Sequence, residues 1–93
     1  MMRIALTDRF QRDARELQGA QRAAMFDMIL SLPPAIGSPH LHAGLGIRKI
    51  HSSGIWEARM GLGLRVIVAI EKDLLSFVRI GSHDEIKRYL KTI

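Results

Sequence analysis

The chain has 93 residues, of which 47% are hydrophobic and 25% charged, and its formal net charge is +5 at pH 7. This length and composition predict one folded domain over residues 1–93, not a disordered chain. The lack of cysteine excludes disulfide and thiolate chemistry, and no apolar run is long enough for a membrane span or a secretory signal. We therefore expect a soluble, cytoplasmic protein whose positive charge suits an anionic partner.

The sequence opens with a predicted strand and a predicted helix. Residues 2–6 form a short apolar run. Thr7 then has the chemistry of a helix N-cap, and Asp8 follows in the first turn, where a negative charge favours the helix dipole. Apolar residues recur at helical spacing with charged residues between them, which predicts an amphipathic helix over about 8–18.

A second helix is predicted after Gly19, with its apolar face formed by Ala23, Phe26, Ile29 and Leu30. Pro33-Pro34 is expected to end this helix, because proline lacks a backbone N–H and restricts the residue before it. Residues 33–45 have a loop composition. We expect several large side chains to fill the core, namely Phe10, Met25, Phe26, Met28 and Trp56.

The second half of the chain predicts strands and a final helix. The strands lie at about 46–51, 55–60, 64–71 and 74–80, and the helix runs from about Ser82 to Leu90. The short connections between the strands are typical of hairpins and so of antiparallel neighbours. The expected fold class is α+β, with an N-terminal strand and a helical hairpin packed on a twisted antiparallel sheet of about four strands.

Three arginines stand out within the predicted strands. Matching the apolar faces of two strands pairs Met60 with Leu64, and this register sets Arg59 opposite Arg65. The same matching around the next turn sets Arg65 opposite Arg79. Because like charges opposite one another destabilise a sheet, such a row is expected to hold an anion, and we favour an RNA phosphate.

Two alternatives stay open at this point. The guanidinium groups can splay apart into water, and Glu57 can neutralise one of them. The register of the strand at 46–51 is also undecided. A three-residue turn sets Lys49 opposite Glu57, whereas a two-residue turn sets Arg48 opposite Arg59 and lengthens the row.

The ordered segments W-E-A-R-M-G-L-G-L-R-V-I-V and V-R-I-G-S-H-D-E resemble the RelE/ParE superfamily of bacterial type II toxins. Members carry a Y-E-x-R strand, a glycine turn, an R-V-I/V-Y strand and a terminal G-x-H-D-E-x-Y segment. The resemblance runs from about Lys49 to Tyr89, and an upstream T-x-x-F-x-x-D pattern agrees. It implies a RelE-like fold and a toxin that cleaves mRNA, usually in the ribosomal A site, and is neutralised by a small antitoxin. The ParE branch inhibits DNA gyrase instead.

The resemblance also implies catalytic positions. Arg59 and Arg65 match the sheet arginines of the family, and His83 matches the histidine of its terminal segment. Lys49 and His51 lie on the strand where members often place a basic catalytic group. These five residues are the expected catalytic set of a metal-independent endoribonuclease.

Further residues are expected to bind phosphate or RNA. Asp84 completes the terminal H-D pair, although capping of the last helix through Ser82 or Asp84 also explains that pair. Arg79 stands at a position that is often basic or apolar in the family. Arg48 adds charge nearby, and Lys87 departs from the family pattern by standing where an aromatic residue is common. Trp56 replaces the family tyrosine.

Metal-free RNA cleavage needs a base, an acid and cations that stabilise the charge on phosphorus. Arginine suits the last task, and His83 can exchange a proton near neutral pH. No cofactor is expected, and His40 with His42 is too small a ligand set for a metal site. The alternatives to a ribonuclease are a gyrase inhibitor and a basic RNA-binding module without catalysis. An antitoxin, mRNA and the ribosome are the expected partners, and a dimer or a toxin–antitoxin hetero-oligomer is possible.

Overall fold

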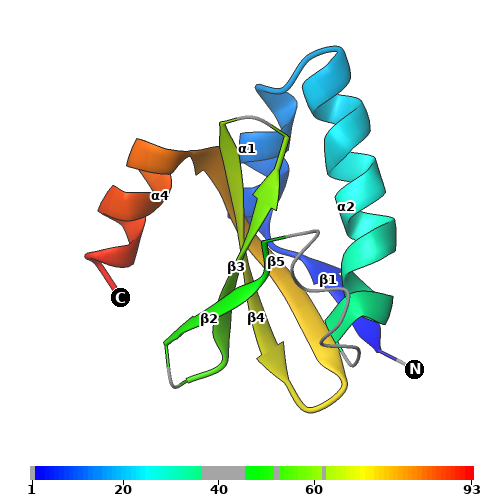
Figure 1. Cartoon of the computed structure of the whole chain (residues 1–93), viewed down its shortest axis with the longest axis vertical. Helices are drawn as coiled ribbons and strands as arrows, with labels where there is room; N and C mark the ends of the chain where they lie inside the picture. The colour runs from blue at the N-terminus through cyan, green and yellow to red at the C-terminus, as the bar shows by residue number, and fades with distance from the viewer. Residues whose placement is uncertain (1, 37–45, 52, 62) are drawn as a thin grey trace.

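The computed structural model describes residues 2–36, 46–51, 53–61 and 63–93. Figure 1 shows a twisted sheet with α1 and α2 on one side and α4 on the other. The sheet order is β1-β5-β4-β3-β2. The strands are β1 (Arg3–Leu6), β2 (Arg48–His51), β3 (Ile55–Met60), β4 (Leu64–Glu71) and β5 (Leu74–Ser82), and the helices are α1 (Asp8–Arg15), α2 (Ala20–Ile36) and α4 (His83–Leu90).

The predicted α+β class is confirmed, with one difference in the sheet. The N-terminal strand β1 pairs parallel with β5, so the sheet has five strands and is mixed. The order places β1 at one edge and β2 at the other. In the described part of the chain, no helix combines the length and apolar character needed to cross a membrane.

Thr7 starts α1 as the sequence predicted. Its Oγ1 accepts a hydrogen bond from the Phe10 N–H at 3.1 Å, and the same hydroxyl donates to the Phe77 carbonyl oxygen at 3.1 Å. One residue therefore caps the helix and fixes it to β5. The helix ends at Arg15, earlier than predicted, and Gly19 adopts a positive φ of 53° in the connection to α2.

The prediction that Pro33-Pro34 ends the second helix is wrong, because α2 continues to Ile36 with both prolines inside it. Proline removes a backbone hydrogen bond. Burial offsets this cost, since Leu32 and Ala35 on either side of the prolines are almost completely buried.

The predicted apolar face of α2 is also wrong, apart from Ile29, which packs against the core. The buried residues are Met25, Met28, Leu32 and Ala35, whereas Phe26 is 56% exposed and Leu30 is 75% exposed. Apolar residues occur around most of this helix, so their spacing alone does not indicate which side faces the sheet.

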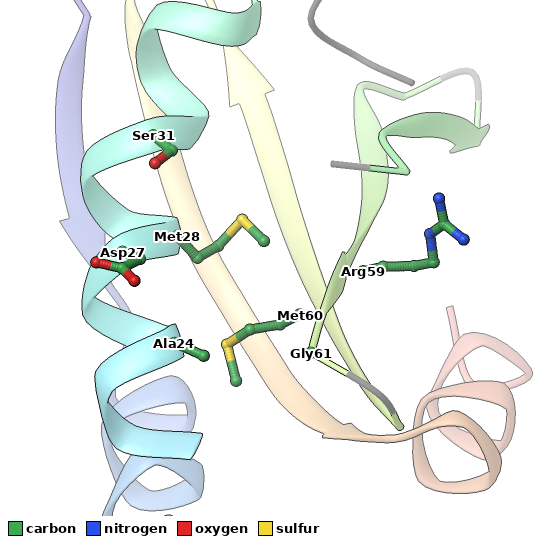
Figure 2. A pocket seen from close by; sticks show the side chains of 7 residues that line it. All are labelled: Ala24, Asp27, Met28, Ser31, Arg59, Met60 and Gly61. Atoms are coloured by element: carbon green, nitrogen blue, oxygen red, sulfur yellow. The ribbon is translucent and has the colours of Figure 1, made fainter. Parts of the chain in front are cut away.

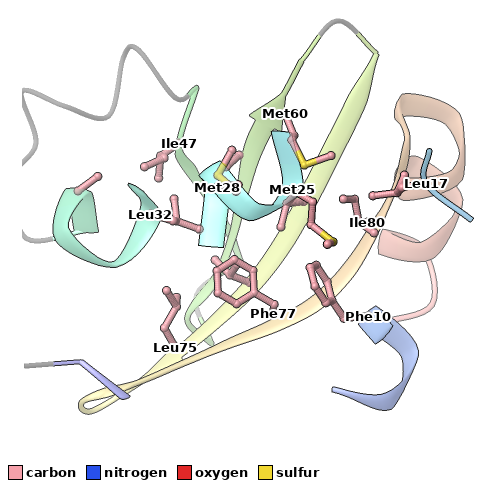
Figure 3. Packing of buried hydrophobic residues seen from close by; sticks show 14 residues of the cluster. Phe10, Leu17, Met25, Met28, Leu32, Ile47, Met60, Leu75, Phe77 and Ile80 are labelled. Atoms are coloured by element: carbon pink, nitrogen blue, oxygen red, sulfur yellow. The ribbon is translucent and has the colours of Figure 1, made fainter. Parts of the chain in front are cut away.

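The main core lies between the sheet and the two N-terminal helices (Figure 3). Phe10 of α1 and Phe77 of β5 are packed against each other with ring centroids 5.4 Å apart. The predicted core positions of Met25 and Met28 are confirmed, and Trp56 packs at the margin. Ile67 and Ile86 are buried outside this cluster, consistent with α4 packing on β4 and β5.

The predicted register between β3 and β4 is confirmed, including Arg59 opposite Arg65. The predicted register between β4 and β5 is wrong. The turn has two residues, with Lys72 at φ 57°, and Arg65 pairs with Gly81.

A register shift between β4 and β5 explains this difference. The shift falls where β4 passes from Ile67 to Val68, and the β5 partners change from Arg79 to Phe77. A bulge of one extra residue turns the following side chains to the other face. It therefore lets both Phe77 and Ile80 reach the core although they lie three residues apart.

Candidate anion-binding site

Arg59 and Arg65 occupy directly opposite positions on β3 and β4. Figure 2 shows Arg59 and Met60 pointing to opposite sides of β3, with Met60 on the side of α2. The arginine pair therefore lies on the sheet face that α1 and α2 leave uncovered. Two like charges at directly opposite positions are unfavourable without an anion nearby.

Glu57 supplies one such anion inside the protein. Its side chain is only 7% exposed, and its Oε1 lies 3.2 Å from Arg48 Nη2 and 3.8 Å from Arg65 Nε. Arg48 Nε donates to the same oxygen at 3.3 Å. The prediction that Glu57 can neutralise an arginine is thus confirmed, and it contacts two of them.

The two predicted registers for the 46–51 strand are both wrong. Arg48 pairs with Glu57, and Lys49 pairs with Trp56. A register shift between Lys49 and His51 accounts for the difference, because an irregularity changes which residues stand opposite one another. In this register Arg48 lies on the same sheet face as Arg59 and Arg65, as the predicted longer row required. Its partner on β3, however, is the carboxylate Glu57 and not Arg59.

We call Arg48, Arg59 and Arg65, together with Glu57, the arginine cluster. Its four residues line a shallow pocket of about 370 Å³, which Gly46 and Ile47 complete. Three guanidinium groups and one carboxylate leave a local charge of +2. Guanidinium groups bind phosphate oxygens through paired, charge-assisted hydrogen bonds, so the pocket has the chemistry of an oxyanion site.

Gly46 is required by the position of Arg59. A Cβ atom at residue 46 would overlap Arg59 Nε and crowd the aliphatic part of its side chain. Gly46 also has φ 62°, a backbone conformation that other residues adopt at a cost. The glycine therefore lets the Arg59 side chain lie directly against the backbone at the margin of the pocket.

His83 is the first residue of α4, and its side chain is exposed. It follows Gly81, the register partner of Arg65, by two residues. Ser82 is the helix N-cap: its Oγ accepts from the Glu85 N–H at 3.1 Å, and Glu85 Oε1 accepts from the Ser82 N–H at 3.0 Å. These bonds lower the pKa of Glu85.

The capping box explains the N-terminus of α4 without any contribution from His83 or Asp84. The capping interpretation is thus confirmed for Ser82 alone, and both following residues are exposed. Lys87 lies one turn after His83 and is also exposed, so these two side chains share a helix face.

Arg79 does not continue the arginine row, which corrects the prediction. It pairs with Ile67, and its side chain is only 10% exposed. Arg79 Nε donates to Asp13 Oδ2 at 2.7 Å, and its Cζ lies 5.2 Å from the centroid of the Tyr89 ring. Asp13 was not expected as a partner, although the T-x-x-F-x-x-D pattern contains it.

Lys49, another predicted catalytic residue, does not join the cluster. Lys49 pairs with Trp56, which packs against the core, so its register position belongs to the opposite sheet face. His51 ends β2, and its side chain lies outside the described part of the structure, as do His40 and His42.

Three solved structures are similar to this chain over nearly its whole length. A copper-bound toxin variant from Helicobacter pylori has 22% sequence identity and a TM-score of 0.74, with 92% of this chain and 99% of that chain covered. YafQ from Escherichia coli has 19% identity and a TM-score of 0.68, with coverages of 92% and 98%. The RelB–RelE antitoxin–toxin complex from Methanococcus jannaschii has 20% identity and a TM-score of 0.66, with coverages of 91% and 96%.

The sequence itself matches no protein-family profile and no curated protein at a significant level. The similarity therefore rests on the arrangement of the strands and helices, and at these identities it concerns the fold. It agrees with the resemblance carried by the sequence motifs. The chain has the fold of the RelE- and YafQ-type toxins.

Proposed function

We propose that this protein is the toxin of a bacterial toxin–antitoxin system and that it cleaves mRNA on the ribosome without a metal ion. The observation that carries the proposal is the direct pairing of Arg59 with Arg65 on the sheet face opposite α1 and α2. Arg48 extends the positive charge across a third strand, β2. The fold shared with RelE- and YafQ-type toxins supports this class of function.

In this proposal the arginine cluster binds the phosphate group at the cleavage point. Hydrogen bonds from Arg59 and Arg65 stabilise the extra negative charge that develops when the ribose 2′-oxygen attacks phosphorus. The 2′-hydroxyl loses a proton, the 2′-oxygen forms a bond to phosphorus, and the bond from phosphorus to the 5′-oxygen breaks. The departing 5′-oxygen takes up a proton.

His83 is the proposed proton-transfer residue. It is exposed at the start of α4, close in register to Arg65, and the helix cap does not involve its side chain. Lys87 and Asp84 are proposed to contact the RNA around it. Lys49 is not proposed as a second proton-transfer residue, because its register position lies on the sheet face opposite the arginine cluster.

Induced expression followed by primer extension on a cellular mRNA tests this function. Wild-type protein is expected to arrest growth and to produce new transcript ends. Arg65→Ala and His83→Ala are expected to abolish both effects, whereas Arg3→Ala removes an exposed arginine on β1 and should preserve them. Growth arrest with intact transcripts contradicts the nuclease proposal and favours a gyrase-type target.

We also propose that a small acidic antitoxin covers the arginine cluster. The local charge of +2 favours a carboxylate-rich segment, and the similar structure from Methanococcus jannaschii is an antitoxin–toxin complex. The test is co-purification with a small acidic protein encoded beside this chain. Loss of the complex in Arg59→Ala, but not in Arg3→Ala, is the expected result.

A further inference from the structure

A second pocket lies between α1, β5 and α4, away from the arginine cluster. It has a volume of about 320 Å³ and is lined by Arg9, Arg79, Glu85, Arg88, Tyr89 and Thr92. Its three arginines come from three different elements of the fold. The folded chain thus brings together guanidinium groups that are far apart in the sequence. None of the three arginines caps a helix or belongs to the main core.

Two of these arginines are held in place by one carboxylate. Asp13 Oδ2 accepts from Arg79 Nε at 2.7 Å, and Asp13 Oδ1 accepts from Arg9 Nε at 3.1 Å. Both bonds use the single Nε–H of each guanidinium, so the terminal nitrogens, which carry the other donors, remain for a further acceptor. The Tyr89 ring, 5.2 Å from Arg79 Cζ, supports the same side chain.

The electrostatics of the pocket also favour an anion. Its lining carries three positive groups and one negative group, Glu85, with the Asp13 carboxylate beneath. Glu85 is already engaged in the helix cap with Ser82, and the positive charges of Arg79 and Arg88 help to lower its pKa. A tetrahedral oxyanion is small enough for this space and matches the donors of the arginines.

Arg79 of this pocket shares a sheet face with the arginine cluster. Arg79 pairs with Ile67 and therefore lies on the same sheet face as Arg65. Two strand spacings, about 10 Å, separate β3 from β5. Between them α4 packs on β4 and β5 and exposes His83, Lys87 and Arg88.

We propose that this pocket binds a phosphate group of the RNA that flanks the one held by the arginine cluster. The proposal rests on the proposed function for its ligand, because RNA supplies phosphates at regular intervals along one chain. Arg9 and Arg88 are the residues that this assignment adds. The second site lengthens the RNA footprint along α4 and anchors the chain on both sides of the cleavage point.

Titration of the ¹⁵N-labelled protein with inorganic phosphate tests the pocket by itself. Saturable shifts are expected at the Arg79 and Arg88 side-chain Nε–H signals, and Arg88→Ala should abolish the effect on Arg79. Arg3→Ala is the matched control, because it removes an arginine that does not line this pocket and that pairs with Asp73 instead. Shifts that are absent, or unchanged in Arg88→Ala, overturn the anion site.

Binding of single-stranded RNA of about ten nucleotides and of about three nucleotides tests the ligand assignment. For the longer RNA, Arg88→Ala is expected to reduce the slope of log K against log salt by about 0.7. When the salt concentration rises tenfold, the affinity of the variant therefore falls roughly fivefold less than that of the wild type. The reduction should be smaller for the short RNA. Equal reductions for both lengths, or preferential binding of an acidic peptide in this pocket, overturn the RNA assignment.

The two proposals fail in different ways. If the wild-type protein binds phosphate in the second pocket but neither RNA binds, the proposed function fails together with the RNA assignment, while the anion site stands. If both RNA lengths bind and Arg65→Ala weakens both, but Arg88→Ala behaves like Arg3→Ala, the proposed function stands and the second RNA contact is refuted.

Discussion

Asp13→Asn provides a quantitative test of how the fold holds Arg79. The change keeps the shape of the side chain and an oxygen that can accept from the Ile80 N–H, which Asp13 binds at 3.0 Å. It removes the negative charge beside Arg79, whose side chain is only 10% exposed. Removing one partner of a buried ion pair costs about 3–5 kcal/mol, and we take the lower value because Tyr89 still contacts the guanidinium.

A loss of about 3 kcal/mol lowers Tm by about 12–24 °C, at about 4–8 °C per kcal/mol for a domain of this size. Thermal unfolding followed by circular dichroism measures the shift. Arg3→Ala is the control because it breaks an exposed ion pair with Asp73, in which the Arg3 side chain is 71% exposed. That pair is expected to contribute about 1 kcal/mol or less. Equal Tm shifts for the two variants refute the reasoning.

Three further predictions concern the arginine cluster and α4. Glu57→Gln should tighten RNA binding about fivefold, because it removes about 1 kcal/mol of repulsion between the carboxylate and a phosphate. Gly46→Ala should weaken RNA binding by displacing Arg59 and cost about 1–2 kcal/mol of stability. Ser82→Ala should cost about 1 kcal/mol by removing the cap of α4. The hydrogen bonds with Ser82 lower the pKa of Glu85. The stability that this cap contributes is therefore present above the ordinary glutamate pKa, and it is lost as pH falls through the lowered pKa.

Each of these predictions has a direct measurement. Fluorescence anisotropy with labelled RNA reports the first two, and unchanged affinity in Glu57→Gln or Gly46→Ala contradicts the account of the pocket. Hydrogen exchange of the α4 amides reports the third across pH. If the α4 amides of Ser82→Ala lose protection at low pH to the same extent as those of wild type, the cap is not the source of the pH dependence.

The sequence predicted the strands most accurately where apolar residues alternate between two faces. The bounds of β3 and β4 are correct to the residue, and the Gly61 to Gly63 turn gives the register that pairs Arg59 with Arg65. Alternation fixes register there, because a shift of one residue turns every side chain to the wrong face.

Other features depend on contacts that no local pattern records. The extent of α2 beyond Pro33 depends on the burial of Leu32, and the position of Arg79 depends on a shift within β5 and on a carboxylate 66 residues earlier. Likewise, the contact of Glu57 with both of its arginines required the actual register of β2. The arginine pair and the neutralising role of Glu57 could thus be predicted from sequence, whereas the second arginine that Glu57 contacts, Arg48, and the second pocket could not.

Binding of single-stranded RNA to the purified protein tests most directly whether the arginine cluster is a phosphate-binding site. The measurement is the affinity of wild type, Arg65→Ala and Arg3→Ala across a series of salt concentrations. Both variants lose one positive charge, so net charge alone predicts the same weakening for both. The account predicts that Arg65→Ala weakens binding strongly and reduces the salt slope by about 0.7, while Arg3→Ala stays close to wild type. Equal behaviour of the two variants would contradict it.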